Sequence, residues 1–116
     1  MPHTDRNKGL HPVLVRQLAA IESRDLDGLM ENYLPDAALL RFEGAWVGTA
    51  ALRELFTGYL TLEPVLIDLT EYVEADDTVF YRAAVGLGGA VADTFGTLVV
   101  REGRIWRQTV AFVDGS

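Results

Sequence analysis

The side chains that could carry chemistry in this chain are carboxylates, phenols and amides. Cysteine is absent, and the two histidines, His3 and His11, both lie near the start. This composition excludes a thiolate nucleophile and a cysteine metal site, and it leaves no histidine pair spaced for a metal in the folded body. We therefore expect no metal and no cofactor. Any reaction would rest on proton transfer by a carboxyl group, helped by hydrogen-bond donors that stabilise a developing oxyanion.

The leading candidate acid or base is Asp93, and the argument comes from the last hairpin. Glu102-Gly103 is typical of a two-residue turn, which would pair Arg101 with Arg104 and, by counting, Asp93 with Phe112. Paired residues share one face of a sheet, and a carboxylate on this mostly apolar face would have its pKa raised by desolvation. An alternative is that Asp93 is solvated at the sheet margin, and a turn one residue longer would exchange the faces. The predicted inner face carries Asp93, Phe95, Thr97, Val99, Trp106, Gln108, Val110 and Phe112.

Glu43 is the second candidate carboxylate. It follows Arg41 by two residues on a predicted strand, so the two side chains share a face that is opposite Leu40 and Phe42. The pair could be an ion pair in a pocket, or a base held by an arginine. An ordinary solvated face is the competing interpretation.

Three further residues are candidate hydrogen-bond donors to an oxyanion: Gln108, Tyr81 and Gln17. The alternation around residue 82 directs Arg82 outward, toward an outer face that could meet a second subunit, and so directs Tyr81 inward. A buried structural tyrosine and a solvated glutamine at the helix boundary are the alternatives for Tyr81 and Gln17.

The elements that would position these residues can be read from hydrophobic periodicity. Helical spacing predicts a helix over 10–23, a second helix capped by Asp25 and ended by Pro35-Asp36, and a third capped by Thr49. A strand is predicted over 37–43. After Pro64 the period changes from 3.6 to 2, which predicts four antiparallel strands at 65–74, 78–87, 91–101 and 105–113. The fold class is α+β, with helices on one face of a bent sheet.

Composition narrows the class of protein further. The chain has 116 residues, is 49% hydrophobic and carries a formal net charge of −7. The length fits one domain, 10–116, preceded by a flexible N-terminal tail at 1–9. The acidic balance argues against nucleic acid and anionic membrane surfaces as partners, and no apolar run is long enough to span a membrane. With no signal peptide at the start, the expected location is cytoplasmic.

Several motifs resemble the NTF2-like superfamily, and within it the SnoaL-like and ketosteroid-isomerase-like branch. The motifs are the segment 25–29 (DLDGL), the segment 33–37 (YLPDA), the segment 48–56 (GTAALRELF) and the final hairpin 96–105 (GTLVVREGRI). The resemblance covers about residues 10–113. It implies a cone-shaped half-barrel in which a curved, mostly antiparallel sheet wraps around three N-terminal helices. It also implies an apolar pocket at one end and a homodimer through the outer sheet face.

The catalytic positions of ketosteroid isomerases are not retained. The position of the helix tyrosine holds Gln17, the position of the aspartate base holds Arg41, and the position of the aspartic acid falls near Phe95 or Gly96. Arg82 is similar to the arginine of limonene epoxide hydrolase-like sites, but Ala84 stands where the paired acid is expected.

The expected function is binding of a small apolar metabolite in the pocket, with cofactor-free isomerisation, cyclisation or dehydration if the protein is an enzyme. Asp93 and Glu43 would then be catalytic. The alternative is a non-catalytic ligand-binding, dimerisation or accessory module, in which the aromatic residues are core. The expected ligand-binding residues are Gln17, Tyr33, Arg41, Trp46, Phe56, Tyr59, Tyr81, Phe95, Gln108 and Phe112.

Overall fold

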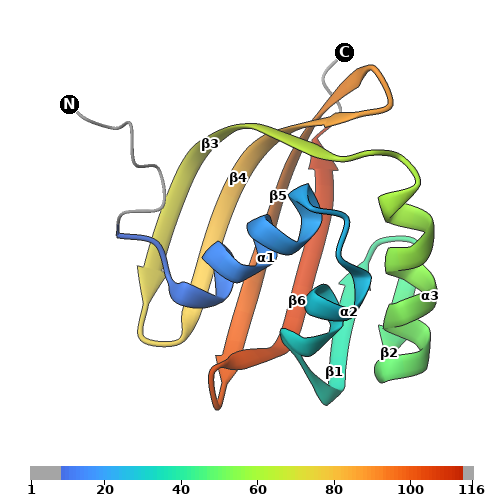
Figure 1. Cartoon of the computed structure of the whole chain (residues 1–116). Coiled ribbons are helices and arrows are strands. Elements are labelled where there is room, and N and C mark those ends of the chain that lie inside the picture. Colours follow the sequence, from blue (N-terminus) through green and yellow to red (C-terminus); the bar gives the residue numbers. More distant parts are fainter. Residues whose placement is uncertain (1–8, 114–116) are drawn as a thin grey trace.

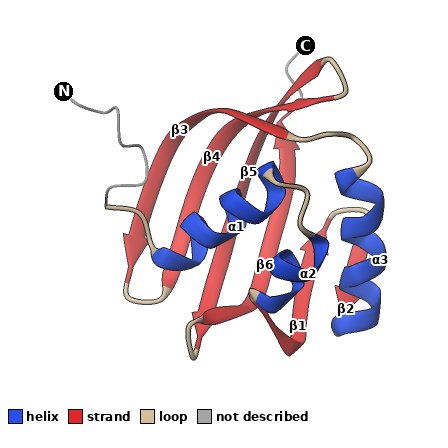
Figure 2. Cartoon of the chain, viewed as in Figure 1, coloured by secondary structure: helices blue, strands red, loops and turns tan. Residues whose placement is uncertain are grey.

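A computed structural model describes residues 9–113 and shows an α+β fold in which three helices cover one face of a six-stranded sheet (Figures 1 and 2). Residues 1–8 and 114–116 lie outside this description, so the predicted tail remains a prediction. The helices are α1 (Pro12–Glu22), α2 (Leu26–Glu31) and α3 (Thr49–Leu60). The strands are β1 (Tyr33–Arg41), β2 (Gly44–Val47), β3 (Val65–Ala75), β4 (Thr78–Leu87), β5 (Ala90–Arg101) and β6 (Arg104–Val113).

The sheet is curved and open rather than closed into a barrel. Its strand order is β2-β1-β6-β5-β4-β3, and every neighbouring pair is antiparallel except β1 with β6. The four-strand meander predicted after Pro64 is confirmed. The first helix lies across the concave face of the sheet, and α3 packs against β1 and β2 at the other end (Figure 1). The predicted arrangement of three helices on a curved sheet is therefore correct.

Local signals define the starts of the helices. Pro12 begins α1, and His11 caps it because its Nδ1 accepts a hydrogen bond from the Val13 N–H at 3.1 Å. Asp25 caps α2 as predicted, since its carboxylate accepts a hydrogen bond from the Gly28 N–H at 3.0 Å. Gly48, rather than Thr49, occupies the cap position of α3.

The predicted extension of the second helix to residue 34 is wrong. The helix ends at Glu31, and β1 already begins at Tyr33, which pairs with Ile105 of β6. The Ile105 N–H donates to the Asn32 carbonyl oxygen at 2.8 Å, which fixes this transition. Pro35 is tolerated in β1 because the register to β6 shifts between residues 33 and 38 and removes the need for its missing N–H.

The final hairpin contains a β-bulge that corrects the predicted register. Arg101 pairs with Arg104 across the turn as predicted, but Val100 pairs with Ile105 while Val99 pairs with Arg107. Trp106 is therefore the extra residue, and every later pair is displaced by one position from the predicted register. Asp93 pairs with Val113. The predicted inner face was right for Gln108, Val110 and Phe112 of β6 and wrong for Trp106 and for β5.

The consequence is visible in the burial of the two strands. On β5 the inward residues are Thr94, Gly96, Leu98 and Val100, which are buried. The outward residues are Asp93, Phe95, Thr97 and Val99, which are exposed or half-buried. On β6, Gln108 faces inward as predicted and is 6% exposed.

Candidate functional site

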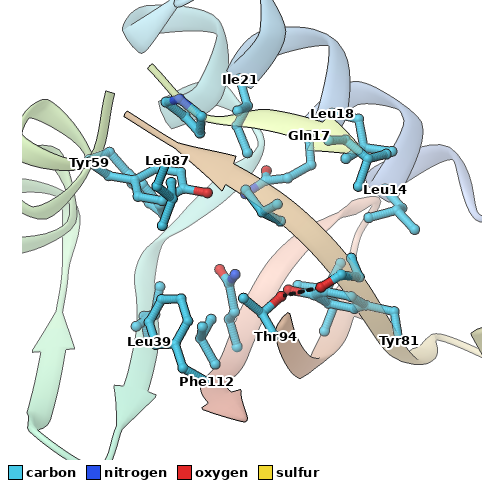
Figure 3. Close-up of a pocket in the computed structure, with 18 of the residues that line it drawn as sticks. Leu14, Gln17, Leu18, Ile21, Leu39, Tyr59, Tyr81, Leu87, Thr94 and Phe112 are labelled. Carbon is cyan, nitrogen blue, oxygen red and sulfur yellow. Dashed lines mark hydrogen bonds between the residues drawn. The ribbon is translucent and has the colours of Figure 1, made fainter. Parts of the chain in front are cut away.

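A cavity of about 130 Å³ lies between the concave face of the sheet and the helices (Figure 3). Side chains from α1, α3 and five of the six strands converge on it, and most of them are aliphatic or aromatic. Such a concave, mainly apolar space with few polar groups is typical of a small-molecule site. Seven of the ten predicted ligand-binding residues line it: Gln17, Arg41, Phe56, Tyr59, Tyr81, Gln108 and Phe112.

Three predicted ligand-binding residues do not line the cavity. Tyr33 is 4% exposed and lies behind the wall, with its ring centroid 5.3 Å from that of Phe56. Trp46 is on β2, the strand at the sheet edge that contributes nothing to the lining. Phe95 is 37% exposed on the outer face because the bulge at Trp106 reverses the predicted orientation of β5.

A chain of hydrogen bonds ends at the cavity and runs in one direction. The Asn32 amide nitrogen donates to Gln17 Oε1 at 2.9 Å, and Gln17 Nε2 donates to the Tyr33 hydroxyl at 2.7 Å. The Tyr33 hydroxyl in turn donates to Gln108 Oε1. Because Gln108 accepts from Tyr33 through its oxygen, its amide N–H groups remain as donors, and its hydrogen bond with the Tyr81 hydroxyl at the cavity uses one of them. Gln108 therefore offers donors toward the cavity.

The start of this chain was not predicted from the sequence. Asn32 is 3% exposed, accepts from Arg16 Nε at 2.9 Å and donates to the Val13 carbonyl oxygen at 3.0 Å. An asparagine at the end of a short helix was its only sequence signal. A buried amide with both ends satisfied holds the Gln17 side chain in one orientation.

Two tyrosines add hydroxyl groups to the polar part of the cavity. Burial raises the pKa of Tyr81 to about 12, and burial also raises the pKa of Tyr59. A hydrogen bond with the Gln108 side chain opposes part of the rise for Tyr81, whereas the Tyr59 hydroxyl forms no hydrogen bond with another side chain or backbone group in the range 9–113. Both phenols therefore stay protonated at neutral pH and can donate to a ligand. The inward orientation predicted for Tyr81 is confirmed.

Gly96 makes the position of Tyr81 possible. The two residues are partners across β4 and β5. A Cβ atom at residue 96 would lie 3.0 Å from the Tyr81 hydroxyl oxygen and 2.3 Å from the Thr109 carbonyl oxygen. Only a residue without a side chain leaves room there for the phenol.

Arg41 is the cation of the cavity wall. It lies two residues after Leu39 on the inner face of β1, whereas Leu40 and Phe42 are exposed, as the alternation predicted. Its Nε donates to Glu43 Oε1 at 3.1 Å. Glu43 itself lies in the β1–β2 turn with 65% of its side chain exposed, and it does not line the cavity.

The prediction of a raised pKa for Asp93 is wrong. Its carboxylate accepts two hydrogen bonds from Arg82 on the outer face, from Nε at 3.1 Å and from Nη2 at 2.5 Å. This bidentate pair holds the pKa of Asp93 below its usual value. The outward orientation predicted for Arg82 is confirmed, and Arg82 pairs with Asp93 on the outer face, where the bulge at Trp106 places that carboxylate.

The lining therefore provides hydrogen-bond donors and a cation but no general base. Among residues 9–113, no aspartate, glutamate or histidine lines the cavity. The same part of the chain also contains no cluster of three or more His, Asp or Glu side chains able to hold a metal ion. What this arrangement can do is enclose an apolar ring and donate hydrogen bonds to an acceptor atom on it.

The sequence model of the SnoaL-like domain family matches residues 14–108, so the chain belongs to this family. The predicted resemblance to the SnoaL-like branch of NTF2-like proteins is confirmed. No protein of curated function matches the sequence. No helix within the described range is long and apolar enough to cross a membrane.

Solved structures share the fold at low sequence identity. A candidate polyketide cyclase from Sinorhizobium meliloti has a TM-score of 0.76 and 20% identity, with 95% of this chain and 99% of that chain covered. A candidate ketosteroid isomerase from Kribbella flavida has a TM-score of 0.80 and 13% identity, with 91% and 78% covered. TerC, co-crystallised with polyporic acid, has a TM-score of 0.71 and 23% identity, with 87% and 88% covered. At these identities the similarity establishes the fold alone.

Proposed function

We propose that this SnoaL-like protein binds a compact, largely apolar cyclic metabolite in the cavity on the concave face of its sheet. The observation that carries the proposal is the composition of the lining, in which an apolar wall surrounds a small set of convergent donors, Tyr59, Tyr81 and Gln108. The donors would bind a carbonyl or hydroxyl oxygen of the ligand while the aliphatic wall encloses its ring.

The volume suggests the size of the ligand. An engineered cavity of roughly 150 Å³ lined by aliphatic and aromatic side chains binds benzene. A cavity of about 130 Å³ therefore suits one ring with small substituents better than a fused polycyclic molecule. TerC, a protein of the same fold, has been co-crystallised with polyporic acid, which supports a small organic ligand here.

The test is a binding screen with a matched pair of variants on one strand. Ala83 lines the cavity and is 4% exposed, whereas Ala84 points to the outer face of β4. Single-ring carbonyl compounds and phenols would be screened by isothermal titration calorimetry. Ala83→Leu should fill the cavity and weaken ligand binding by at least tenfold, whereas Ala84→Leu should leave the affinity unchanged. Equal affinity of both variants, or no binding to the wild type, would contradict the proposal.

A catalytic function is the second candidate, and the donors Tyr81 and Gln108 favour it. Two donors aimed at one oxygen could stabilise an enolate or alkoxide as it forms. Because the lining offers no base, the proton would have to leave to water or to another group of the substrate. Turnover of a ligand found in the screen, lost in Tyr81→Phe while the ligand still binds, would support this activity.

A further inference from the structure

We propose that the ligand is an anion, a small ring that carries a carboxylate or an ionised enol or phenol, and that Arg41 binds this charge at the cavity wall. The inference rests on the proposed function, because it names the chemical class of the molecule that the cavity accepts. It assigns to Arg41 the role of selecting charge, a role distinct from the donors that bind a neutral oxygen.

The position of Arg41 is the first argument. Residues 9–113 place one charged side chain in the lining of the cavity, and it is this guanidinium. Its Cζ atom lies 5.6 Å from the ring centroid of Phe112, which also lines the cavity, and 5.7 Å from that of Trp46. The two aromatic rings keep the guanidinium beside the apolar wall, where water screens its charge less than it would at the surface.

The unused hydrogen-bonding capacity of Arg41 is the second argument. Glu43 accepts only from Nε, at 3.1 Å. The two terminal nitrogens form no hydrogen bond with any other described residue. A guanidinium has five N–H donors in a planar fork, and two of them match the two oxygens of a carboxylate. The structure therefore leaves free the part of Arg41 that recognises a planar anion.

The other charges around the site make the third argument. With 65% of its side chain exposed, Glu43 is a weak competitor, because exposed ion pairs contribute little. Among residues 9–113, no carboxylate lies in the lining to repel an incoming anion. The other polar side chains of the lining are uncharged, and among them the protonated phenols of Tyr59 and Tyr81 can donate to a ligand oxygen with negative charge. Within residues 9–113 the charge of the lining is thus positive, in a chain whose net charge is −7.

The competing interpretation is that Arg41 is structural. In that case its stacking on the aromatic rings and its bond to Glu43 are sufficient for its position, and ligand charge is irrelevant. The two interpretations differ in one measurable quantity, which is the affinity for an anion divided by the affinity for its neutral isostere.

The experiment measures this ratio with two pairs of probes. Benzoate and phenylacetate are compared with benzamide and phenylacetamide by calorimetry at pH 7 in low salt. The anions should bind the wild type about tenfold or more tightly than the amides, and tenfold corresponds to ~1.4 kcal/mol. The variant Arg41→Gln should reduce the ratio to about one, and Arg41→Lys should retain part of it.

Two further variants separate local from general charge effects. Arg53→Gln removes an exposed arginine that pairs with Asp27 on the helices and does not line the cavity; it changes net charge as Arg41→Gln does and should leave the ratio unchanged. Glu43→Gln removes the competing carboxylate and should raise the affinity for benzoate. Circular dichroism confirms that each variant is folded.

The outcomes are distinct. A wild-type ratio near one, or a ratio that persists in folded Arg41→Gln, overturns the inference and leaves the proposed binding function intact. An equal loss of the ratio in Arg53→Gln also overturns it, since the effect would then come from net charge. If none of the four probes binds, the binding function falls and this inference falls with it.

Discussion

The hydroxyl of Tyr33 should be worth about 2 kcal/mol to the folded state, and removing it in Tyr33→Phe tests the hydrogen-bond chain behind the cavity. The hydroxyl accepts from Gln17 Nε2 at 2.7 Å and donates to Gln108 Oε1. Without it, two buried amide groups lose a partner. A buried donor or acceptor left unsatisfied costs about 1–3 kcal/mol. Gln108 borders the cavity and can turn toward solvent there, so we place the full cost on Gln17 and a smaller one on Gln108.

The assay is equilibrium unfolding in urea, with Tyr59→Phe as the matched control. For a slope of ~2 kcal/mol per M, a loss of about 2 kcal/mol lowers the midpoint by about 1 M. The Tyr59 hydroxyl faces the cavity without a hydrogen bond to a described residue, so its removal should change stability by less than about 0.5 kcal/mol. If the two variants unfold at the same urea concentration with the same slope, the chain does not stabilise the fold and our reasoning about the site is refuted.

Four further predictions follow from the same geometry. Gly96→Ala should cost more than about 2 kcal/mol in urea unfolding, because a Cβ there lies 2.3 Å from a backbone carbonyl oxygen; Gly58→Ala, in an open helical position, should be neutral or stabilising. The contribution of Tyr81 to stability should be constant up to about pH 10 and then fall, because the raised pKa of Tyr81, about 12, keeps its proton bound in the folded state while the unfolded state releases it; the loss is ~1.4 kcal/mol per pH unit between the two pKa values, and denaturation at pH 9 and 11 measures it. NMR titration should give Asp93 a pKa below that of a free aspartate, so its contribution to stability is present above about pH 4 and is lost as the pH falls; a value near 6 would contradict the outer-face placement. Deletion of Trp106 should preserve the pairing on both sides of the bulge, and thus ligand binding, while lowering stability by ~2 kcal/mol through loss of the half-buried indole.

Much of the fold follows from sequence signals that act locally. The apolar spacing of α1, the Asp25 cap and the change of period after Pro64 each depend on neighbouring residues, and each predicted its element correctly. The start of β1 did not follow, because Tyr33 has helical spacing relative to α2 and is drawn into the sheet by pairing with Ile105, 72 positions away in the chain. A pairing between residues far apart in the sequence can override the local helical pattern, and the sequence around Tyr33 does not reveal it.

The expected homodimer and cytoplasmic location remain predictions.

The candidate site was predicted only in part. The bulge at Trp106 explains why the predicted face of β6 is largely correct and that of β5 is wrong. The faces of both strands were counted from the Glu102-Gly103 turn, and the face assigned to β6 is correct at Gln108 and Phe112. The face assigned to β5 depended on regular pairing across the hairpin, which Trp106 interrupts. Its ring lies between the guanidinium groups of Arg101 and Arg107, at 3.7 and 3.8 Å from their Cζ atoms. Stacking of two guanidinium groups on one indole ring stabilises the bulge. In the sequence, however, Arg101, Trp106 and Arg107 look like ordinary strand residues, so nothing in it predicts the bulge.

The bulge at Trp106 changes which charged group faces the cavity, and therefore which chemistry the site could support. With regular pairing, a desolvated Asp93 would supply the proton transfer that an isomerase needs. With the bulge, Arg82 pairs with Asp93 on the outer face, and the charged group that residues 9–113 place in the cavity wall is Arg41. Arg41 also holds the position at which the resemblance to ketosteroid isomerases expects an aspartate base. A cation there cannot accept a proton but can bind an anion, and the bulge turns Asp93 away from the cavity, so two independent features argue against proton abstraction by these two residues.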